Sequence, residues 1–326
     1  MRRSANMTEI SSIDLGPPAE MNRSAGAAAL AGGGRARRQP VARAALRACR
    51  PRQWSKNALL LAAPAAGGIL ATAAGEVAAG VVTFCMLSSA TYLFNDVRDA
   101  DVDRAHPVKR LRPVASGDLP ARSALALSVV LALAGLGIAA AVRPALAAVG
   151  CAYLLLTACY SIWLRHVIVA DMLAIAGAFV LRAVAGGAAT GIGLSRWFLL
   201  VTSFGAIFVV AGKRHAELFG KDVAVRAGAT RATLRRYSEP ALLAVLAAAA
   251  AGTVGAYIRW AVGRPGHGPW YVITIVPVVL WLARYALLVS RGAGEAPEEL
   301  ILRDHALLAL TLAWTALFLG GVYVGG

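Results

Sequence analysis

The sequence has few charged residues for its length, and acids are the scarcer kind. Of 326 residues, 15% are charged, and 17 Asp and Glu stand against 33 Lys and Arg, which leaves a formal net charge of +16. Hydrophobic residues make up 58% of the chain, and the mean hydropathy is +0.63. Because soluble domains carry about 25% charged residues, this composition excludes an ordinary soluble domain. We expect the surplus apolar surface to face lipid.

Cysteine is also scarce, and its positions exclude two common kinds of site. The chain has four cysteines, no two of them in a C-x-x-C pair, and three lie in or beside apolar runs, where a thiol behaves as a small hydrophobe. We therefore expect neither a disulfide nor a metal site built from cysteine.

The first 40 residues lack an apolar run long enough for a cleaved signal peptide. They are rich in Ala, Gly, Ser and Arg and show no periodicity. We interpret residues 1–40 as a disordered basic arm, and residues 41–326 as one all-α integral membrane domain.

Long apolar runs dominate the rest of the chain. A helix that crosses a bilayer needs about 20 such residues, and nine runs approach that length, which predicts nine transmembrane helices. The runs lie near 57–74, 76–95, 121–142, 144–163, 168–187, 196–212, 239–258, 269–290 and 304–324.

The polar segments between these runs alternate between basic and nearly uncharged. Eleven Lys and Arg precede residue 57, six lie in 98–122 and seven in 213–236. Because cytoplasmic loops carry the excess of Lys and Arg, we expect the N-terminus and both long basic loops to face the cytoplasm. The positive charge then suits the lipid bilayer or a phosphorylated substrate, and we expect no nucleic acid as a partner.

Four of the 17 acids lie within eight residues after the second apolar run. If the helix continues there, Asp96, Asp99 and Asp103 share one face with Asn95, whereas Asp101 points elsewhere. Carboxylates stacked at that spacing repel one another unless a cation neutralises them, and oxygen ligands suit Mg²⁺ together with substrate phosphates. The alternative is a solvated acidic helix end paired with Arg98 and Arg104.

Cations follow the acids directly, between two prolines. Arg112 offers a planar fork to phosphate and Lys109 a point charge, so acids and bases in one loop can hold both a metal and the phosphates that it bridges. For any single cation, the plainer interpretation is the positive-inside signal. His106 and Arg110 belong to the same group.

Three further polar positions lie at or inside the membrane. Lys56 and Asn57 begin the first apolar run, where an interfacial anchor is the plain interpretation, and Arg182 lies inside the fifth run, where a cation should face a polar cavity or an anionic ligand. Tyr160 lies near the turn between the fourth and fifth runs, and an aromatic belt residue is an equally good interpretation.

The acidic stripe resembles a known motif. Asn95-Asp96-x-x-Asp99-x-x-x-Asp103 is similar to the first aspartate-rich motif of the UbiA superfamily of intramembrane prenyltransferases. The resemblance runs from about Arg50 to the end of the chain. It implies nine helices around a central cavity that opens to lipid, with Mg²⁺ and a diphosphate held at the cytoplasmic mouth by two loops.

Further matches resemble the decaprenyl-phosphate phosphoribosyltransferase branch of that superfamily. They are spread along the chain in the order of the branch. They comprise Arg50-Pro51-x-Gln53-Trp54-x-Lys56-Asn57, Asp103-x-x-His106-Pro107-x-Lys109-x-x-Arg112-Pro113, Phe179-x-x-Arg182-x-x-x-Gly186, Lys213-Arg214-x-x-Glu217, and Ala296-Pro297-Glu298-Glu299 followed by Asp304. One departure is Arg165, where the branch pattern has Lys, and this difference weakens any role assigned to that position.

The resemblance implies a Mg²⁺-dependent enzyme of the cell membrane that moves 5-phosphoribosyl from 5-phosphoribosyl 1-diphosphate to a polyprenyl phosphate for cell-wall arabinan synthesis, with release of diphosphate. Asn95, Asp96, Asp99 and Asp103 would hold the metal. The substrate-binding residues would be Lys56, Asn95, Lys109, Arg112, Tyr160, Arg182, Lys213, Arg214 and Glu217. Assembly into a homo-oligomer stays open.

Two other functions compete with this interpretation. An aromatic prenyltransferase of the same superfamily would share the first motif but should carry a second aspartate cluster in 213–236, where only Asp222 is found. A transporter or scaffold would be favoured by helix breaks near the bilayer midplane. The Gly-rich stretches near 186–193 and 263–268 look instead like loops at helix ends.

Overall fold

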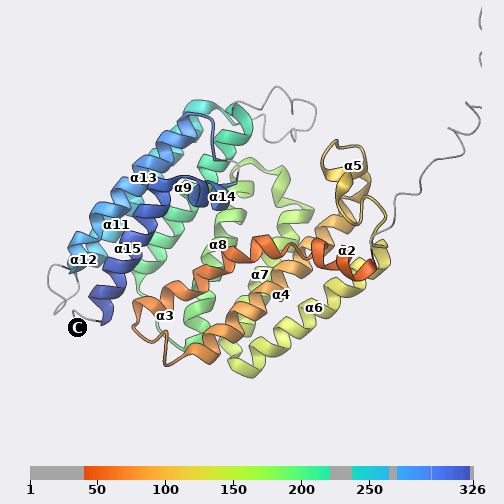
Figure 1. Cartoon of the computed structure of the whole chain (residues 1–326), viewed down its shortest axis with the longest axis horizontal. Coiled ribbons are helices and arrows are strands. Elements are labelled where there is room, and N and C mark those ends of the chain that lie inside the picture. Colours follow the sequence, from red (N-terminus) through yellow and green to blue (C-terminus); the bar gives the residue numbers. More distant parts are fainter. Residues whose placement is uncertain (1–39, 221–236, 264–269, 295, 324–326) are drawn as a thin grey trace, which may run out of the picture. The chain divides into compact units, whose positions relative to one another are not determined.

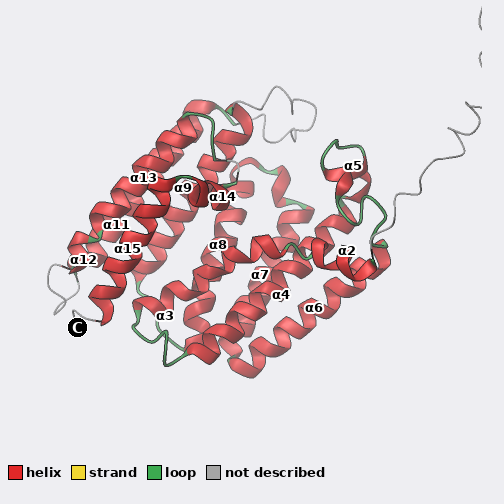
Figure 2. Ribbon diagram, in the orientation of Figure 1, coloured by secondary structure: helices red, strands yellow, loops and turns green. Residues whose placement is uncertain are grey.

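The computed structural model describes residues 40–220, 237–263, 270–294 and 296–323. Figure 2 shows only helices and connecting loops among them. The predicted arm, 1–40, lies outside the described residues except for its last position, as does Asp222.

Among the described residues, eight helices are long and apolar enough to cross a membrane, so the predicted all-α membrane class is confirmed. Two of these helices have a proline at one of their first two positions, and two begin with a serine N-cap. Ser195 Oγ accepts from the backbone N–H of Phe198, and Ser238 Oγ accepts from that of Ala241. The eight are α4 (Ala74–Arg98), α6 (Ala121–Val142), α7 (Pro144–Ile162), α8 (Ile168–Thr190), α9 (Arg196–Phe219), α11 (Glu239–Val262), α12 (Trp270–Ile273) with α13 (Ile275–Ser290), and α15 (His305–Tyr323).

The first predicted span, 57–74, differs from the other eight. It is covered by a 3-10 helix, η1 (Pro51–Leu61), and a short helix, α3 (Ala62–Ala66). The helix ends there because Gly68, at φ 70°, takes a left-handed conformation that stops it. Five short elements complete the part of the chain that the structure describes: α2 (Val41–Ala48), α5 (Ala100–Arg104), η2 (Lys109–Leu111), η3 (Leu164–His166) and α14 (Pro297–Arg303).

The helices pack in two neighbouring groups (Figure 1). Helices α4, α6, α7 and α8 contact one another on one side, α9, α11, α13 and α15 on the other, and the two groups meet where α8 packs against α9. Aromatic residues fill each interior, with Phe84 and Tyr153 in the first group and Phe208 and Tyr285 in the second.

The outer surface is apolar, as a membrane protein requires. On α6, Leu125, Val129, Val130 and Leu133 are all exposed, and they recur at the spacing of one helical face. This face is suited to lipid, in agreement with the composition.

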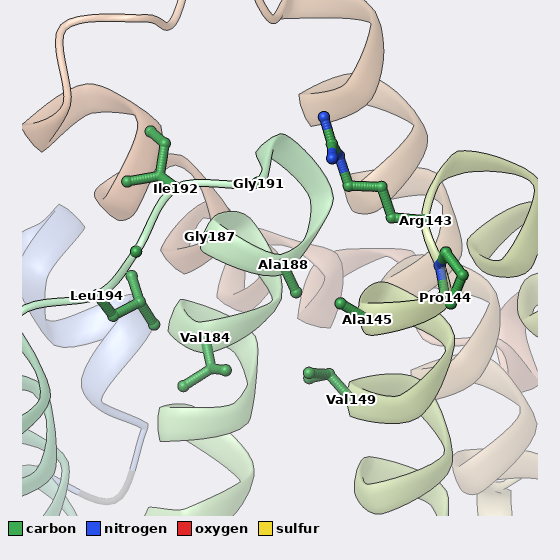
Figure 3. A pocket seen from close by; sticks show the side chains of 11 residues that line it. Arg143, Pro144, Ala145, Val149, Val184, Gly187, Ala188, Gly191, Ile192 and Leu194 are labelled. Carbon is green, nitrogen blue, oxygen red and sulfur yellow. The ribbon is translucent and has the colours of Figure 1, made fainter.

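A cleft of about 520 Å³ lies beside α7 and α8, at the end of the bundle where α6 ends and α7 begins (Figure 3). Its walls are mostly small and apolar, with Arg143 at one side. None of the predicted site residues lines it, so we do not take it as the candidate site.

One close approach ties η1 to α8. A Cβ at Gly186 would lie 2.0 Å from the backbone oxygen of Leu60, and backbone cannot give way as a flexible side chain can. Only glycine therefore allows η1 to rest on α8 at this point.

We expect Gly186→Ala to lower the melting temperature of the detergent-solubilised protein, since overpacking costs about 1–3 kcal/mol. Gly205→Ala on α9 is the matched control, because a Cβ there meets nothing within 4 Å. Equal melting temperatures for Gly186→Ala and wild type would contradict the close packing.

Candidate active site

The acidic stripe forms at the end of α4. Helix α4 ends at Arg98, and Asp99 (φ −93°, ψ 4°) joins it to α5. Hydrogen bonds from the N–H of Asp99 to the oxygen of Asn95, and from that of Asp103 to the oxygen of Asp99, carry the i to i−4 pattern across this joint. The predicted shared face is therefore preserved despite a local change in backbone conformation.

Burial separates the acids as the spacing predicted. Asp96 is 2% exposed and Asp103 is 3% exposed, and Asp99 is half-buried. Asp101 points into solvent and pairs with Arg104. Asp101 is thus set apart from the other three acids.

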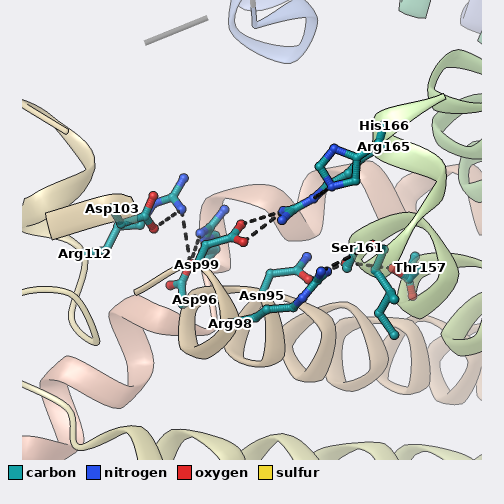
Figure 4. A network of polar contacts seen from close by, with 12 residues as sticks. Asn95, Asp96, Arg98, Asp99, Asp103, Arg112, Thr157, Ser161, Arg165 and His166 are labelled. Carbon is teal, nitrogen blue, oxygen red and sulfur yellow. Dashed lines mark hydrogen bonds and ion pairs between the residues drawn. The ribbon is translucent and has the colours of Figure 1, made fainter. Parts of the chain in front are cut away.

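Three arginines from three different segments neutralise the buried face (Figure 4). Arg50 pairs with Asp96, and Arg112 Nη1 lies 2.6 Å from Asp103 Oδ2 and 3.5 Å from Asp96 Oδ1. These arginines come from the junction of α2 with η1 and from the loop after η2. Asp96 and Asp103 are close enough to share one guanidinium group.

Arg165 is the third of these arginines. Its Nη1 lies 2.9 and 3.1 Å from the two carboxylate oxygens of Asp99. The sequence comparison with the branch pattern discounted this position, because Lys was expected, but the structure brings its side chain into the cluster. We call Asn95, Asp96, Asp99, Asp103 and these three arginines the acid cluster.

The alternative of a plainly solvated helix end fits only part of the geometry. Arg104 does pair with Asp101, but Arg98 donates to the backbone oxygen of Ile162 and has no acidic partner in the part of the chain that the structure describes. Asn95 accepts from the hydroxyl of Ser161, which ties α4 to α7. The buried acids are therefore held by residues other than those the solvated alternative named.

Backbone conformation at Arg50 sets that residue apart. With φ 55° and ψ 61° it is the only non-glycine residue of positive φ among those the structure describes, and such a conformation is costly for a residue with a Cβ. The ion pair with Asp96, and the stacking of its guanidinium on Tyr92 at 5.0 Å, hold it there. Such outliers gather at functional sites.

His106 lies in the loop after α5 and accepts two backbone hydrogen bonds there. The imidazole Nδ1 accepts from the backbone N–H of Val108 and from that of Lys109, at 3.2 and 3.3 Å. Slight burial, and then the charge of Lys109, lowers the pKa of His106, which keeps the ring neutral and able to accept. His106 thus shapes the loop that carries Lys109 and Arg112.

The acid cluster contains the kind of oxygen ligands that a divalent cation binds. Asp96 Oδ2 is buried without a hydrogen-bond partner, and Asp96, Asp99 and Asp103 supply the hard oxygen ligands that Mg²⁺ takes. Within the described ranges no three acidic, His or Cys side chains converge on one point, because each carboxylate is turned toward an arginine. Those guanidinium groups supply the neutralising charge that the spacing demanded.

A second charged group lies at the end of α9. Arg214 is 4% exposed and pairs with Asp171 of α8 and with Glu217, while Lys213 Nζ is 3.9 Å from Glu217 Oε1. The hydroxyl of Tyr160 donates to Asp171. Asp171 was outside the predicted site, although an acid inside an apolar run is a signal that could have found it.

Lys56 and Arg182 have neighbours that the sequence did not predict. Lys56 Nζ lies 3.3 Å from Glu298 Oε1 of α14. Burial favours a higher pKa for Glu298, but the charge of Lys56, followed by that of Lys213, lowers it. The second charged group therefore reaches across to η1 and α14.

Arg182 is buried in the interior and fully engaged by neutral groups. It donates to Asn57 Oδ1 at 3.0 Å, Tyr153 Oη at 2.8 Å and the oxygen of Ala178 at 2.8 Å. It has no carboxylate partner among the described residues. A phosphate contact for Arg182 stays a prediction.

Comparison with known proteins agrees with this fold. Residues 58–309 match the UbiA prenyltransferase family, and the chain belongs to that family. A UbiA homolog from Archaeoglobus fulgidus, solved with DMAPP and Mg²⁺, has the same fold, with a TM-score of 0.62 at 19% identity over 86% of this chain and 98% of that one.

The predicted branch is also confirmed. The chain is 42% identical over 279 residues to a decaprenyl-phosphate phosphoribosyltransferase of Mycobacterium tuberculosis, across 83% of this chain and 91% of that protein. It is 41% identical over 302 residues to the protein of the same name in Corynebacterium glutamicum, across 88% and 90% of the two chains.

We expect Mg²⁺ to raise the melting temperature of the wild-type protein, because a ligand at 100 times its dissociation constant stabilises by about 2.7 kcal/mol. Asp99→Asn should reduce this shift, and Asp101→Asn, which removes an exposed acid of the same loop, should keep it. Equal shifts in the two variants would exclude Asp99 as a ligand.

Proposed function

We propose that this protein transfers the 5-phosphoribosyl group of 5-phosphoribosyl 1-diphosphate to decaprenyl phosphate or a similar polyprenyl phosphate, with release of diphosphate. The observation that carries the proposal is the identity of about 40% with proteins of that name, over nine-tenths of their length. The reaction takes place in the cell membrane and feeds cell-wall arabinan synthesis.

The acid cluster binds the leaving diphosphate in this proposal. Asn95, Asp96, Asp99 and Asp103 would hold Mg²⁺, which when bound neutralises diphosphate charge and makes it a better leaving group. Arg112 and Arg165 are within reach to move from a carboxylate to a phosphate oxygen. Lys109 lies in the same loop.

The cations of the acid cluster and of the second charged group differ in exposure. Lys56, Arg112 and Lys213 keep side chains that are 20%, 30% and 34% exposed, whereas Arg182 and Arg214 are nearly covered. We assign direct phosphate contact to the exposed cations. Burial favours a supporting role for Arg182, Arg214, Tyr160 and Glu217.

The chemistry needs positioning and charge neutralisation more than a base. The bond from the anomeric carbon to diphosphate breaks, the diphosphate leaves with the electron pair, and an oxygen of the lipid phosphate forms the new bond to that carbon. The lipid phosphate is already ionised at neutral pH, so no proton has to be removed. Two anionic substrates repel one another, and fixed cations lower that barrier.

Membrane placement follows from the positive charge of the loops. The acid cluster lies at the end of the bundle where α4 ends, together with the basic loop 98–122. We propose that this end and the N-terminus are cytoplasmic, because a phosphorylated sugar donor is a cytoplasmic metabolite and because Lys and Arg favour that side.

The charge at the end of α9 argues against an aromatic prenyltransferase. That activity would use a second set of carboxylates after the sixth span, whereas the described residues there carry Lys213 and Arg214, with Glu217 tied to the latter. Two cations at this position, one of them with a side chain that is 34% exposed, suit a second phosphorylated substrate better than a second metal.

The deciding experiment uses membranes that contain the protein, polyprenyl phosphate, Mg²⁺ and 5-phosphoribosyl 1-diphosphate labelled in the ribose. Wild type and Asp101→Asn should move label into the organic phase, whereas Asp99→Asn should not. Absence of lipid-linked label with wild type, together with prenylation of an aromatic acid from a polyprenyl diphosphate, would replace the proposal with the aromatic activity.

We expect Lys213→Ala to lower kcat/KM for 5-phosphoribosyl 1-diphosphate. The loss should correspond to about 1.5–3 kcal/mol of transition-state stabilisation, the cost of losing a charge-assisted contact. Arg196→Ala is the control, because Arg196 lies on the same helix at its opposite end and stacks on Trp197. Wild-type kinetics for Lys213→Ala would remove α9 from the site.

A further inference from the structure

Asp171 is an almost completely buried acid in the first turn of α8. It is 1% exposed, so it cannot touch a substrate. Its Oδ1 accepts from the hydroxyl of Tyr160 at 3.1 Å and from Arg214 Nη2 at 2.9 Å, and its Oδ2 lies 2.8 Å from the same nitrogen. A charge at this depth is costly unless a partner holds it, and here one guanidinium and one phenol do so.

Arg214 is held on two sides. One terminal nitrogen binds Asp171 and the other binds Glu217, one turn further along α9. The contacts therefore join the end of α9 to α8 through Asp171, and to α7 through Tyr160. The guanidinium group acts as a clamp between helices and is not open to a ligand.

Lys213 precedes Arg214 and points in another direction, because neighbouring residues on a helix are about 100° apart. Its ammonium group is one-third exposed and 3.9 Å from Glu217. Its charge also reaches Glu298, the partner of Lys56. The rotation of α9 about its axis decides where Lys213 points, and the Arg214 clamp fixes that rotation.

We propose that Asp171 is a positioning residue for phosphoribosyl transfer: by holding Arg214 it fixes the end of α9 and so directs Lys213 at the donor's phosphates. This inference rests on the proposed function. It assigns the buried acid no contact with substrate, and it makes Lys213 the side chain through which Asp171 acts.

The first test compares steady-state kinetics of purified wild type, Asp171→Asn and Asp171→Glu. Asp171→Asn should raise the KM for 5-phosphoribosyl 1-diphosphate about fivefold or more with a smaller change in kcat, and Asp171→Glu, which keeps the charge, should recover part of that loss. A role in stability alone would lower the amount of folded protein and leave KM unchanged.

The second test places the same change in a Lys213→Ala background. If Asp171 acts through Lys213, its effect on KM should fall below about twofold there, because coupled residues are not additive. Full additivity would overturn the inference. Should Asp171→Asn fail to fold, Arg214→Lys carries the same test, since it keeps the charge but loses the two-sided fork.

Asp304→Asn is the matched control. It also removes an acid that joins an arginine, Arg284, across two elements at 2.7 Å, but it lies outside the charged group at the end of α9. It should lower the melting temperature and leave KM unchanged. A rise in KM equal to that of Asp171→Asn would overturn the assignment.

The two proposals can fail separately. If wild type transfers label and Asp171→Asn keeps a wild-type KM, the positioning role is disproved but the phosphoribosyl transfer is not. Wild type that transfers no label disproves the phosphoribosyl transfer, and the inference with it.

Discussion

The arrangement of the bundle end at which α4 stops depends on neutralising three acids that share one helical face. Carboxylates at that spacing cannot be buried together without cations. Arg50, Arg112 and Arg165 provide them, and they come from the junction of α2 and η1, from the loop after α5 and from the turn between α7 and α8. The charge requirement of a few residues on α4 therefore fixes three separate segments around them.

Opposite charges organise the two halves of the site in different ways. In the acid cluster, carboxylates form the face and arginines pair with them. Under the proposed function, Mg²⁺ would bind these carboxylates while the arginines pair with phosphate. At the end of α9, the acids Asp171 and Glu217 lie behind the cations. There they hold Arg214, whose side chain is 5% exposed, whereas the side chain of Lys213 is 34% exposed.

Most of the fold could be predicted because apolar length and the spacing of charges are local properties. Eight spans follow from run length, and the separation of Asp101 from the other acids follows from helical periodicity. The first span could not be read from hydropathy, since an apolar run does not show that part of it is a 3-10 helix or that Gly68 ends the helix early. The partners of the charged residues were harder to predict, because Arg165 and Asp99 are 66 residues apart in the sequence, and Asp171 and Arg214 are 43 residues apart.

The same long-range contacts set an order of events during synthesis. Arg50 adopts a costly backbone conformation that Asp96 supports from 46 residues further on, and Asn57 meets Arg182 from 125 residues away. The segment α2 to α3 is made before its native partners, which do not exist until α4 and then α8 have been made. The earliest part of the membrane domain to be synthesised is therefore among the last to become fixed.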